Sequence, residues 1–372
     1  MREELSSLDL HFLIKEFESI LHSKIYQVFQ IGNTLVFQLY LSNKEKKYLT
    51  IILPNFIFLS EEKEGIGESG NFALSLRKHI NNARIRKIKQ KEFERIVEIE
   101  LEAKEKSLKL IVELFRPGNI ILCDDTYKII MAKEYKGFGS RVIRPGIIYD
   151  YPKKEFNFLE LKEIDLVNVI ENSDKTSVVI TLAVDLGLGG LYAEEICEIA
   201  KVDKKKASLD KSEIKRVYSA IESIKNRKID AHIYYEKENI LDITPFELAK
   251  YKGKKFETSD SFNLSLSLHL MHLSKQEKKK QHLSKYEHEK VKLEKIIKNQ
   301  ETQIAGMLAS SIENQKKGEL IYEKYSMLNN IMHELKKARE KYSWKEIKEK
   351  LKDHKLIKEI IEKDKKIILE LE

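Results

Sequence analysis

The chain has 372 residues, of which 42% are hydrophobic and 34% charged, and its formal net charge is +8. This length is enough for two or three domains with buried cores. No apolar run approaches the ~18 residues that a membrane helix needs, and the first residues lack the apolar stretch of a signal peptide. Its two cysteines, Cys123 and Cys197, exclude a disulfide framework and a four-cysteine zinc site. We therefore expect a soluble cytoplasmic protein with reduced thiols and no membrane-spanning segment.

The positive charge is concentrated in the last quarter of the chain. Residues 275–372 contain 25 basic and 18 acidic side chains, whereas residues 1–274 contain 43 and 42. A basic segment of this kind favours a polyanionic partner, either nucleic acid or a membrane surface. The charge alone does not choose between them.

The first section, residues 1–152, has the pattern of a β-rich domain with two helices. Apolar residues recur on one face of residues 8–21, which predicts a helix, and a second helix is predicted over residues 71–82. Strands are predicted over residues 24–31, 34–41, 47–53, 56–59, 92–101, 107–114, 120–124 and 128–134. Many of them alternate apolar and polar residues, as half-buried antiparallel strands do. We expect a β-sandwich or flattened barrel.

The second section, residues 160–271, is predicted to be mainly helical. Two helices flank a glycine hairpin containing Gly187, Gly189 and Gly190, and further elements are predicted over residues 210–226 (helix) and 231–242 (hairpin). In a helix–hairpin–helix element, such glycines turn backbone N–H groups outward beside a helix N-terminus, which suits a phosphate. The alternative is a tight turn in which glycine meets only steric needs, and the nearby Glu194 and Glu195 argue against a strong anion site.

The third section, residues 274–342, consists largely of Lys, Glu, Leu and Ile without proline. Its apolar residues approximate a three-four spacing, which predicts a long coiled-coil arm and leaves a dimer through that arm open. Ser343 and Glu346 have the spacing of a capping box, so a new helix should begin there. Residues 343–372 are therefore interpreted as the start of a further domain, ending in an incipient strand.

Sequence signals for catalysis or metal binding are weak. Residues 65–70 match G-x-G-x-x-G, but a charged spacer precedes them and the neighbouring strands are predicted to be antiparallel, so we interpret them as a loop. His269 and His272 share a helix turn without a third ligand at a matching spacing. A nucleophile elbow, a P-loop and a paired-carboxylate signature are missing. We therefore expect no catalytic residues, no metal and no cofactor.

Two basic clusters remain. The first flanks the helix at residues 71–82, and the second surrounds the loop at residues 137–139. Their members are Arg77, Lys78, His79, Arg84, Arg86, Lys87, Lys89 and Lys91 in the first, and Lys136, Arg141 and Arg144 in the second. Each is either a solvated charged face or a phosphate-binding surface.

Several linked motifs, in the right order, resemble those of the NFACT family. These factors of ribosome quality control are typified by NEMF and RqcH and are often labelled fibronectin-binding proteins. The motifs are Leu5–Asp9, Phe72–His79, Gln90–Val97, Val112–Leu122, Arg144–Tyr149 and Gly187–Cys197. The chain resembles the N-terminal half of an archaeal member, so we expect it to be the front half of a longer factor.

The resemblance implies an α+β fold. The N-terminal domain would be similar to formamidopyrimidine-type DNA glycosylases, followed by a helix–hairpin–helix domain and a long coiled coil with a middle domain at its tip. It also implies binding to the large ribosomal subunit and its rRNA, with a stalled peptidyl-tRNA in place. The factor would engage tRNA, chiefly alanyl-tRNA, and support template-free C-terminal addition of alanine to nascent chains.

The resemblance also implies a set of tRNA-binding residues in the first section. They are Arg77, Lys78, His79, Arg84, Glu94, Arg95, Arg116, Asn119, Arg141 and Arg144. The family's Asp-Arg pair, which tailing requires, falls on Glu94 and Arg95. The acid here is a glutamate, one methylene longer than the family's aspartate.

Two other functions are alternatives to this one. A DNA-lesion glycosylase is suggested by the fold resemblance alone, but Met1–Glu3 offers no proline nucleophile and the zinc cysteines are missing. A surface adhesin is suggested by the label fibronectin-binding protein. It would need a signal peptide, and the first residues lack the apolar stretch of one. We therefore expect a non-catalytic nucleic-acid-binding factor.

Overall fold

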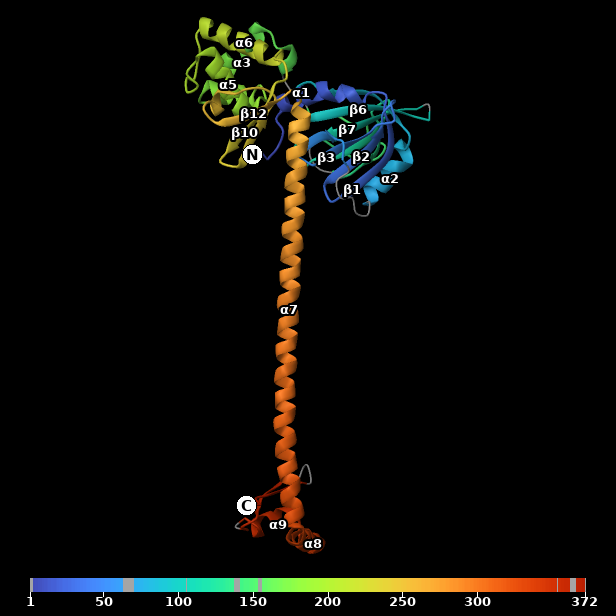
Figure 1. Cartoon of the computed structure of the whole chain (residues 1–372), viewed down its shortest axis with the longest axis vertical. Helices are drawn as coiled ribbons and strands as arrows, with labels where there is room; N and C mark the ends of the chain where they lie inside the picture. Colours follow the sequence, from blue (N-terminus) through green and yellow to red (C-terminus); the bar gives the residue numbers. More distant parts are fainter. Residues whose placement is uncertain are drawn as a thin grey trace. The chain divides into compact units, whose positions relative to one another are not determined.

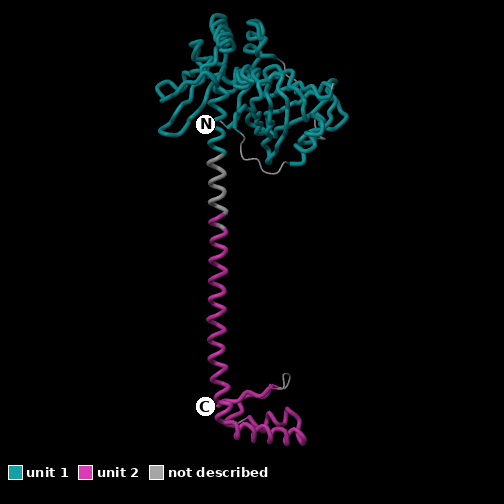
Figure 2. The backbone as a smooth tube through the Cα atoms, turned by 45° about the vertical axis from the view of Figure 1, so that its right-hand side comes forward, with its two compact units in different colours: residues 1–276 teal, residues 277–372 magenta. Residues whose placement is uncertain are grey.

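The computed structural model describes residues 3–62, 70–104, 106–136, 141–152, 156–352, 354–361 and 366–371, leaving out the side chains of 275–285 and 288. Met1, most of the G-x-G-x-x-G loop and the loop at residues 137–139 lie outside the described residues. The chain divides into two compact units, Met1–Gln276 and Glu277–Glu372 (Figure 2).

The first unit is built around an antiparallel sheet (Figure 1). Its strand order is β4-β3-β2-β1-β5-β6-β7-β8-β9. The strands are β1 (Lys24–Ile31), β2 (Thr34–Tyr40), β3 (Lys46–Ile52), β4 (Phe56–Ser60), β5 (Arg84–Gln90), β6 (Ile96–Ala103), β7 (Lys106–Glu113), β8 (Asn119–Asp124) and β9 (Ile129–Ala132). In the described register, β1 and β5 are joined by the pair Lys24 and Arg84. Phe37 of β2 and Leu110 of β7 nevertheless belong to one buried core, so both halves of the sheet pack around it.

The strand predictions are confirmed except at β5, which the sequence did not indicate, and at residues 92–95, which precede β6. This strand, RIRKIKQ, turns Ile85 and Ile88 toward the core while its basic residues face outward. Lys89 is opposite Glu98 of β6, and its Nζ atom lies 2.9 Å from Glu98 Oε1. Cross-strand charge pairs of this kind stabilise a strand whose outward side chains would otherwise repel each other.

Two helices pack on the core of the sheet. Helix α1 (Ser7–Phe17) begins with a capping box in which Ser6 Oγ accepts the Asp9 N–H at 3.1 Å and Asp9 Oδ2 accepts the Ser6 N–H at 2.8 Å. Helix α2 (Asn71–Ile80) buries Ala73, Leu76 and Ile80 in the same core. The first unit is therefore a mixed α+β structure, and its likeness to DNA glycosylases stays a prediction.

The section after residue 156 is mainly helical, as predicted, with a small sheet in the order β11-β10-β12. Its elements are η2 (Phe158–Glu160), α3 (Glu163–Asn172), α4 (Val178–Val184), α5 (Gly189–Ala200), α6 (Lys211–Lys225), β10 (Ala231–Glu236), β11 (Asn239–Thr244), η3 (Ala249–Tyr251) and β12 (Lys255–Ser259). The predictions for α5, α6 and the β10–β11 hairpin are confirmed, whereas α3 and β12 were not predicted. Phe246 packs on Phe12 of α1 with ring centroids 5.4 Å apart. Both sequence sections thus contribute to one core, and their division into two domains stays a prediction.

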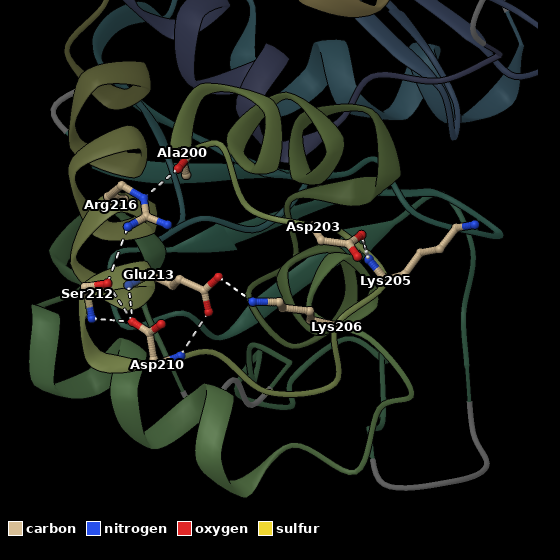
Figure 3. A network of polar contacts seen from close by, with 8 residues as sticks. All are labelled: Ala200, Asp203, Lys205, Lys206, Asp210, Ser212, Glu213 and Arg216. Carbon is tan, nitrogen blue, oxygen red and sulfur yellow. Dashed lines mark hydrogen bonds and ion pairs between the residues drawn. The ribbon is translucent and has the colours of Figure 1, made fainter.

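Polar contacts fix the start of α6 (Figure 3). Asp210 Oδ1 accepts the N–H groups of Ser212 and Glu213 at 2.8 and 2.9 Å, an N-cap that satisfies otherwise unpaired helix donors. Glu213 also pairs with Lys206 at 2.6 Å. Arg216 Nε donates to the carbonyl of Ala200 at 3.0 Å, which ties α6 to the end of α5.

Helix α7 (Phe262–Glu323) begins 12 residues before the predicted start of the arm at residue 274. Phe262, Leu266 and Leu270 belong to the core of the first unit, so its first turns are part of that unit. At β4, the outer strand, Leu59 N–H donates to Asn263 Oδ1 at 2.7 Å and Asn263 Nδ2 donates to Leu59 O at 3.0 Å.

The second unit has a small core of its own. Leu335, Ile347, Ile357 and Ile360 are buried there. Its further elements are α8 (Tyr325–Lys341), α9 (Trp344–Lys350), β13 (Ile357–Ile361) and β14 (Lys366–Leu369). The predicted capping box at Ser343 is confirmed, and the coiled-coil pairing of α7 stays a prediction. No helix in the described ranges combines the length and apolar character needed to cross a bilayer.

Candidate nucleic-acid interface

The strand register separates the predicted basic residues into two groups at opposite ends of the sheet. Arg84 begins β5, and Lys78 and His79 lie close by in the last turn of α2. Arg95 lies in the turn after β5, and that strand of seven residues spans roughly 20 Å at ~3.3 Å per residue. One phosphate therefore cannot contact both groups, although a nucleic acid with several phosphates can.

Arg95 and Arg116 share one end of the sheet. The turn after β5 and the turn after β7 are joined there, because the Leu114 N–H donates to the Arg95 carbonyl at 2.8 Å. Arg116 is exposed in the second turn, and Arg144 is exposed in the segment after β9. Residues 92–95, predicted as the beginning of a strand, belong to the first turn instead, and β6 begins at Ile96.

The turn that holds Arg95 is fixed against the start of α1. Gln90 Nε2 donates to the Ser7 carbonyl at 2.8 Å and to the Glu94 carbonyl at 2.9 Å. The Glu94 N–H donates to the Lys91 carbonyl at 3.0 Å, and the Glu94 side chain is half-buried. The backbone around Arg95 is therefore held in place before any ligand arrives.

The Arg95 guanidinium has two partners on the segment that precedes α1. Its Nη1 atom lies 2.6 Å from Glu4 Oε2 and 3.4 Å from the Leu5 carbonyl oxygen. These contacts direct the guanidinium into a cleft of about 450 Å³, which we call the Arg95 cleft. It is lined by Glu3, Glu4, Leu5, Ser6, Ser7, Arg95, Ala183, Gly187, Leu188, Gly189, Gly190 and Leu191.

The Arg95 cleft brings together two features that the sequence indicated separately. Arg95 belongs to the Glu94–Arg95 pair of the first section, whereas the glycines join α4 to α5 in the second. Gly187 and Gly189 have φ angles of +70° and +74°, which side-chain-bearing residues rarely adopt, so the turn itself requires them. A Cβ atom added at Gly190 would meet none of the described atoms within 4 Å. The packing around Gly190 therefore does not require glycine.

A buried hydrogen bond holds the two walls of the cleft together. Tyr192 of α5 donates from its hydroxyl to Asp9 Oδ1 of α1 at 2.5 Å, and both side chains are fully buried. Because Asp9 also caps α1, the same carboxylate fixes the start of α1 and the first turn of α5. No local sequence pattern indicates this contact, since the two residues come from different sections.

In the sequence, Glu194 and Glu195 argue against an anion site at the glycine hairpin. This objection does not apply to the Arg95 cleft. Both residues line a different cavity, of about 460 Å³, next to Cys197. Glu194 is paired with Lys204 at 2.8 Å. Glu195 is buried and accepts the Ala249 N–H at 2.7 Å, and its burial raises the pKa of the carboxyl group.

Three of the predicted tRNA-binding side chains make contacts within the protein, and their role in tRNA binding stays a prediction. Arg77 Nε donates to the Val28 carbonyl at 2.6 Å, and its guanidinium lies over the Phe29 ring. Asn119 is buried, and its amide pairs with both backbone groups of Glu134 at 2.9 and 3.0 Å. These side chains support the sheet and are not available to a ligand without breaking those bonds.

Arg141 is the third such residue. Its Nη2 atom lies 2.7 Å from Glu113 Oε1, which also accepts the Tyr149 hydroxyl at 2.8 Å. Burial alone would lower the pKa of Arg141, but the hydrogen bond and charge of Glu113 raise it above its usual value. Glu113 of β7 and Glu98 of β6 are both buried acids, and the sequence did not indicate either of them.

The described residues contain no group of three His, Cys, Asp or Glu side chains placed to hold a metal ion. Burial lowers the pKa of His269 and raises that of the Cys123 thiol to about 12 and of the Cys197 thiol to about 11. Both thiols are therefore protonated and poorly nucleophilic near neutral pH.

Comparison with known proteins places these features in a family. The model of the NFACT N-terminal and middle domains matches residues 6–353. The archaeal Rqc2 homolog aRqcH of Methanocaldococcus jannaschii is 29% identical over 394 residues, covering 100% of this chain and 58% of that protein. A ribosome quality control complex subunit NEMF homolog of Drosophila melanogaster is 25% identical over 195 residues, or 50% of this chain and 20% of the relative.

The fold is also similar to a solved structure. The fibrinogen binding protein from Staphylococcus aureus superposes with a TM-score of 0.57 at 18% identity, covering 70% of this chain and 97% of that chain. An identity this low supports the fold alone. The chain spans a little over half of the length of its archaeal relative. Because the family model matches most of the sequence, the chain belongs to the NFACT family, represented here by its N-terminal and middle domains.

Proposed function

We propose that this chain is part of a ribosome-associated quality-control factor that acts in the cytoplasm. In this proposal it binds tRNA, preferentially alanyl-tRNA, and the large ribosomal subunit carrying a stalled peptidyl-tRNA. It supports template-free alanine tailing of the nascent chain without catalysing a reaction itself. Membership of the NFACT family supports this proposal, as do relatives named as an Rqc2 homolog and as a ribosome quality control complex subunit.

The observation that carries the proposal is the Arg95 cleft. It combines a guanidinium, which binds phosphate oxygens through paired N–H donors, with the glycine-rich start of α5. The helix N-terminus adds positive potential, and the missing side chains let a phosphate backbone approach closely. We interpret the turn between α4 and α5 as the hairpin of a helix–hairpin–helix element.

The exposed basic residues extend this interface. Arg116 would contact phosphates near the cleft, because its turn is joined to that of Arg95. Lys78, His79, Arg84 and Arg144, which are also exposed, would contact other parts of the ligand. A ligand that reaches both ends of β5 must extend over roughly 20 Å, which a folded tRNA does. The basic excess of residues 275–372 would lie along ribosomal RNA.

The proposal is tested with Arg95→Ala in a tRNA-binding titration at several salt concentrations. We expect about a tenfold loss of affinity for alanyl-tRNA, or roughly 1.4 kcal/mol, because a charge-assisted contact to phosphate is removed. The slope of log affinity against log salt should fall by roughly 0.7–0.9, the contribution of one phosphate contact. Lys254→Ala, which removes an exposed charge in the loop before β12, is the matched control. Equal tRNA affinity and equal salt slope for the wild type and Arg95→Ala would show that the Arg95 cleft is not part of the tRNA interface.

A further inference from the structure

The Arg95 cleft already holds an anion that the chain itself supplies. Glu4 Oε2 lies 2.6 Å from Arg95 Nη1, and both residues line the cleft. Glu3 lines it as well, so the described lining residues carry two carboxylates against one guanidinium. In this state the cleft repels a phosphate, because Glu4 neutralises Arg95 and Glu3 leaves a net negative charge among the lining residues.

We propose that Glu4 is an intramolecular competitor for the phosphate that Arg95 binds, and that an RNA phosphate displaces the Glu4 side chain from the guanidinium. A carboxylate and a phosphate present oxygen pairs of similar geometry to a guanidinium, so the two anions compete for the same donors. This inference rests on the proposed function and names the subsite at which the RNA backbone enters the cleft.

The surrounding contacts allow Glu4 to leave without any unfolding. Leu5 is 3% exposed and its N–H donates to the Asn55 carbonyl at 3.0 Å, while Ser6 caps α1. The backbone on the C-terminal side of Glu4 is therefore anchored, and rotation of the Glu4 side chain is enough to release Arg95. That side chain is 45% exposed, so water can solvate the carboxylate once it is released.

Arg95 remains in position when Glu4 leaves. Its backbone carbonyl is fixed by the Leu114 N–H, and its side chain keeps the Leu5 carbonyl as a second partner. The Arg95 side chain is 23% exposed, so most of it is packed against the protein. Displacement of Glu4 thus exchanges one anion for another at a site that is already formed.

The test follows inorganic phosphate binding to the full chain by NMR of ¹⁵N-arginine-labelled protein. The Arg95 Nε–H signal is assigned as the one that disappears in Arg95→Lys. Glu4→Gln should shift the midpoint of the Arg95 titration to about fivefold lower phosphate concentration, the factor expected when a partly exposed competing ion pair is removed. The same variant should also bind alanyl-tRNA more tightly by a similar factor.

Glu92→Gln is the matched control. Glu92 pairs with Lys91 at 2.8 Å in the same turn, but it is not among the residues that line the cleft. It should leave the Arg95 midpoint unchanged. An equal shift in both variants would overturn the inference, because it would show a general effect of net charge, and an unchanged midpoint in Glu4→Gln would overturn it as well.

The phosphate and tRNA titrations separate this inference from the proposed function. If Glu4→Gln shifts the phosphate midpoint while Arg95→Ala leaves tRNA affinity unchanged, the competition stands and the tRNA proposal fails at this site. If Arg95→Ala weakens tRNA binding while Glu4→Gln leaves both titrations unchanged, the tRNA proposal stands and the competition is refuted.

Discussion

Gly190 has no steric reason within the described fold to be glycine. It lies in the first turn of α5, outside the left-handed region, and the space beside it is open to an added methyl group. Glycine in a helix is less stable than alanine by ~1 kcal/mol, so the residue weakens α5 without relieving any contact. Close approach of a ligand backbone at the cleft would explain this choice.

Gly190→Ala should therefore have opposite effects on stability and binding. We expect the free energy of unfolding to rise by about 0.5–1 kcal/mol and alanyl-tRNA affinity to fall several-fold, because the new methyl group stands where the phosphate approaches. Chemical denaturation and a binding titration on the same preparation measure both. Gly306→Ala, at an equally open helical position in α7, should stabilise its helix and leave tRNA affinity unchanged. A gain in stability with unaltered affinity for Gly190→Ala would show that no ligand approaches there.

At the level of residues, the sequence located the parts of the candidate site without their arrangement. Motifs pointed to Arg95 and to the glycines, but their place in one cleft goes with the buried bond from Tyr192 to Asp9, which joins the two sections. Arg77, Asn119 and Arg141 have suitable chemistry in sequence, yet internal partners occupy their side chains. Whether a polar side chain faces a ligand or a neighbouring strand is decided by the fold, which local sequence does not encode.

Elements with one clear periodicity were predictable, and those with a misleading pattern were not. Strand β5 was missed because its outward residues are basic, and its stability comes from acidic partners on β6. The first turns of α7 read FNLSLSLHLMHL, an alternation typical of a strand. The helix nevertheless buries Phe262, Leu266 and Leu270, which are four residues apart, and leaves Leu264 and Leu268 exposed, as a helix packed on the core by one side does.

The packing of α1 makes stability depend on pH through His11. Burial, and secondarily the charge of Lys15, lower the pKa of His11 to about 4 from 6.5. Between these values the unfolded chain binds a proton that the folded protein does not, so stability is lost as pH falls through the unfolded pKa toward the folded one. After allowance for partial solvent exposure of the ring, the loss should be about 1–2 kcal/mol.

Denaturant titrations of the wild type and His11→Gln between pH 7 and pH 4 measure this effect. The difference between the two proteins cancels the other titrating groups, and the wild type should lose more stability on acidification by about 1–2 kcal/mol. His79→Gln, at an exposed position on α2, controls for the removal of an imidazole. Parallel curves for the wild type and His11→Gln would show that burial of the ring contributes nothing to acid sensitivity.

In the molecule as a whole, the candidate site lies in the first unit, whereas most of the positive charge excess lies in the second. The first unit contains the Arg95 cleft and both basic ends of β5 but carries 44 basic and 42 acidic residues. The second unit, residues 277–372, carries 24 and 18. Affinity for polyanions in general and the contribution of Arg95 should therefore be separable.

Residues 1–276 expressed alone should fold cooperatively, because the large core of the first unit lies within them. We expect weaker tRNA binding and a smaller salt slope than for the full chain, since fewer basic side chains contribute. The fold-loss caused by Arg95→Ala should be the same in both proteins, as for independent sites. Calorimetry measures the cooperativity of unfolding, and salt titrations measure tRNA affinity and its salt slope. A smaller effect of Arg95→Ala in the shorter protein would show that the contribution of Arg95 depends on the second unit.

The amide of Asn263 also blocks association of β4 with a strand of a second molecule. Strand β4 ends the sheet, and an outer strand with unpaired N–H and C=O groups is a template on which a strand of another molecule can add. Asn263 pairs with both backbone groups of Leu59 and occupies that position with a side chain, which offers no further edge to extend. The residue that anchors the long helix is thus also a block against edge-to-edge aggregation, so loss of its amide would first appear as self-association rather than as loss of RNA binding.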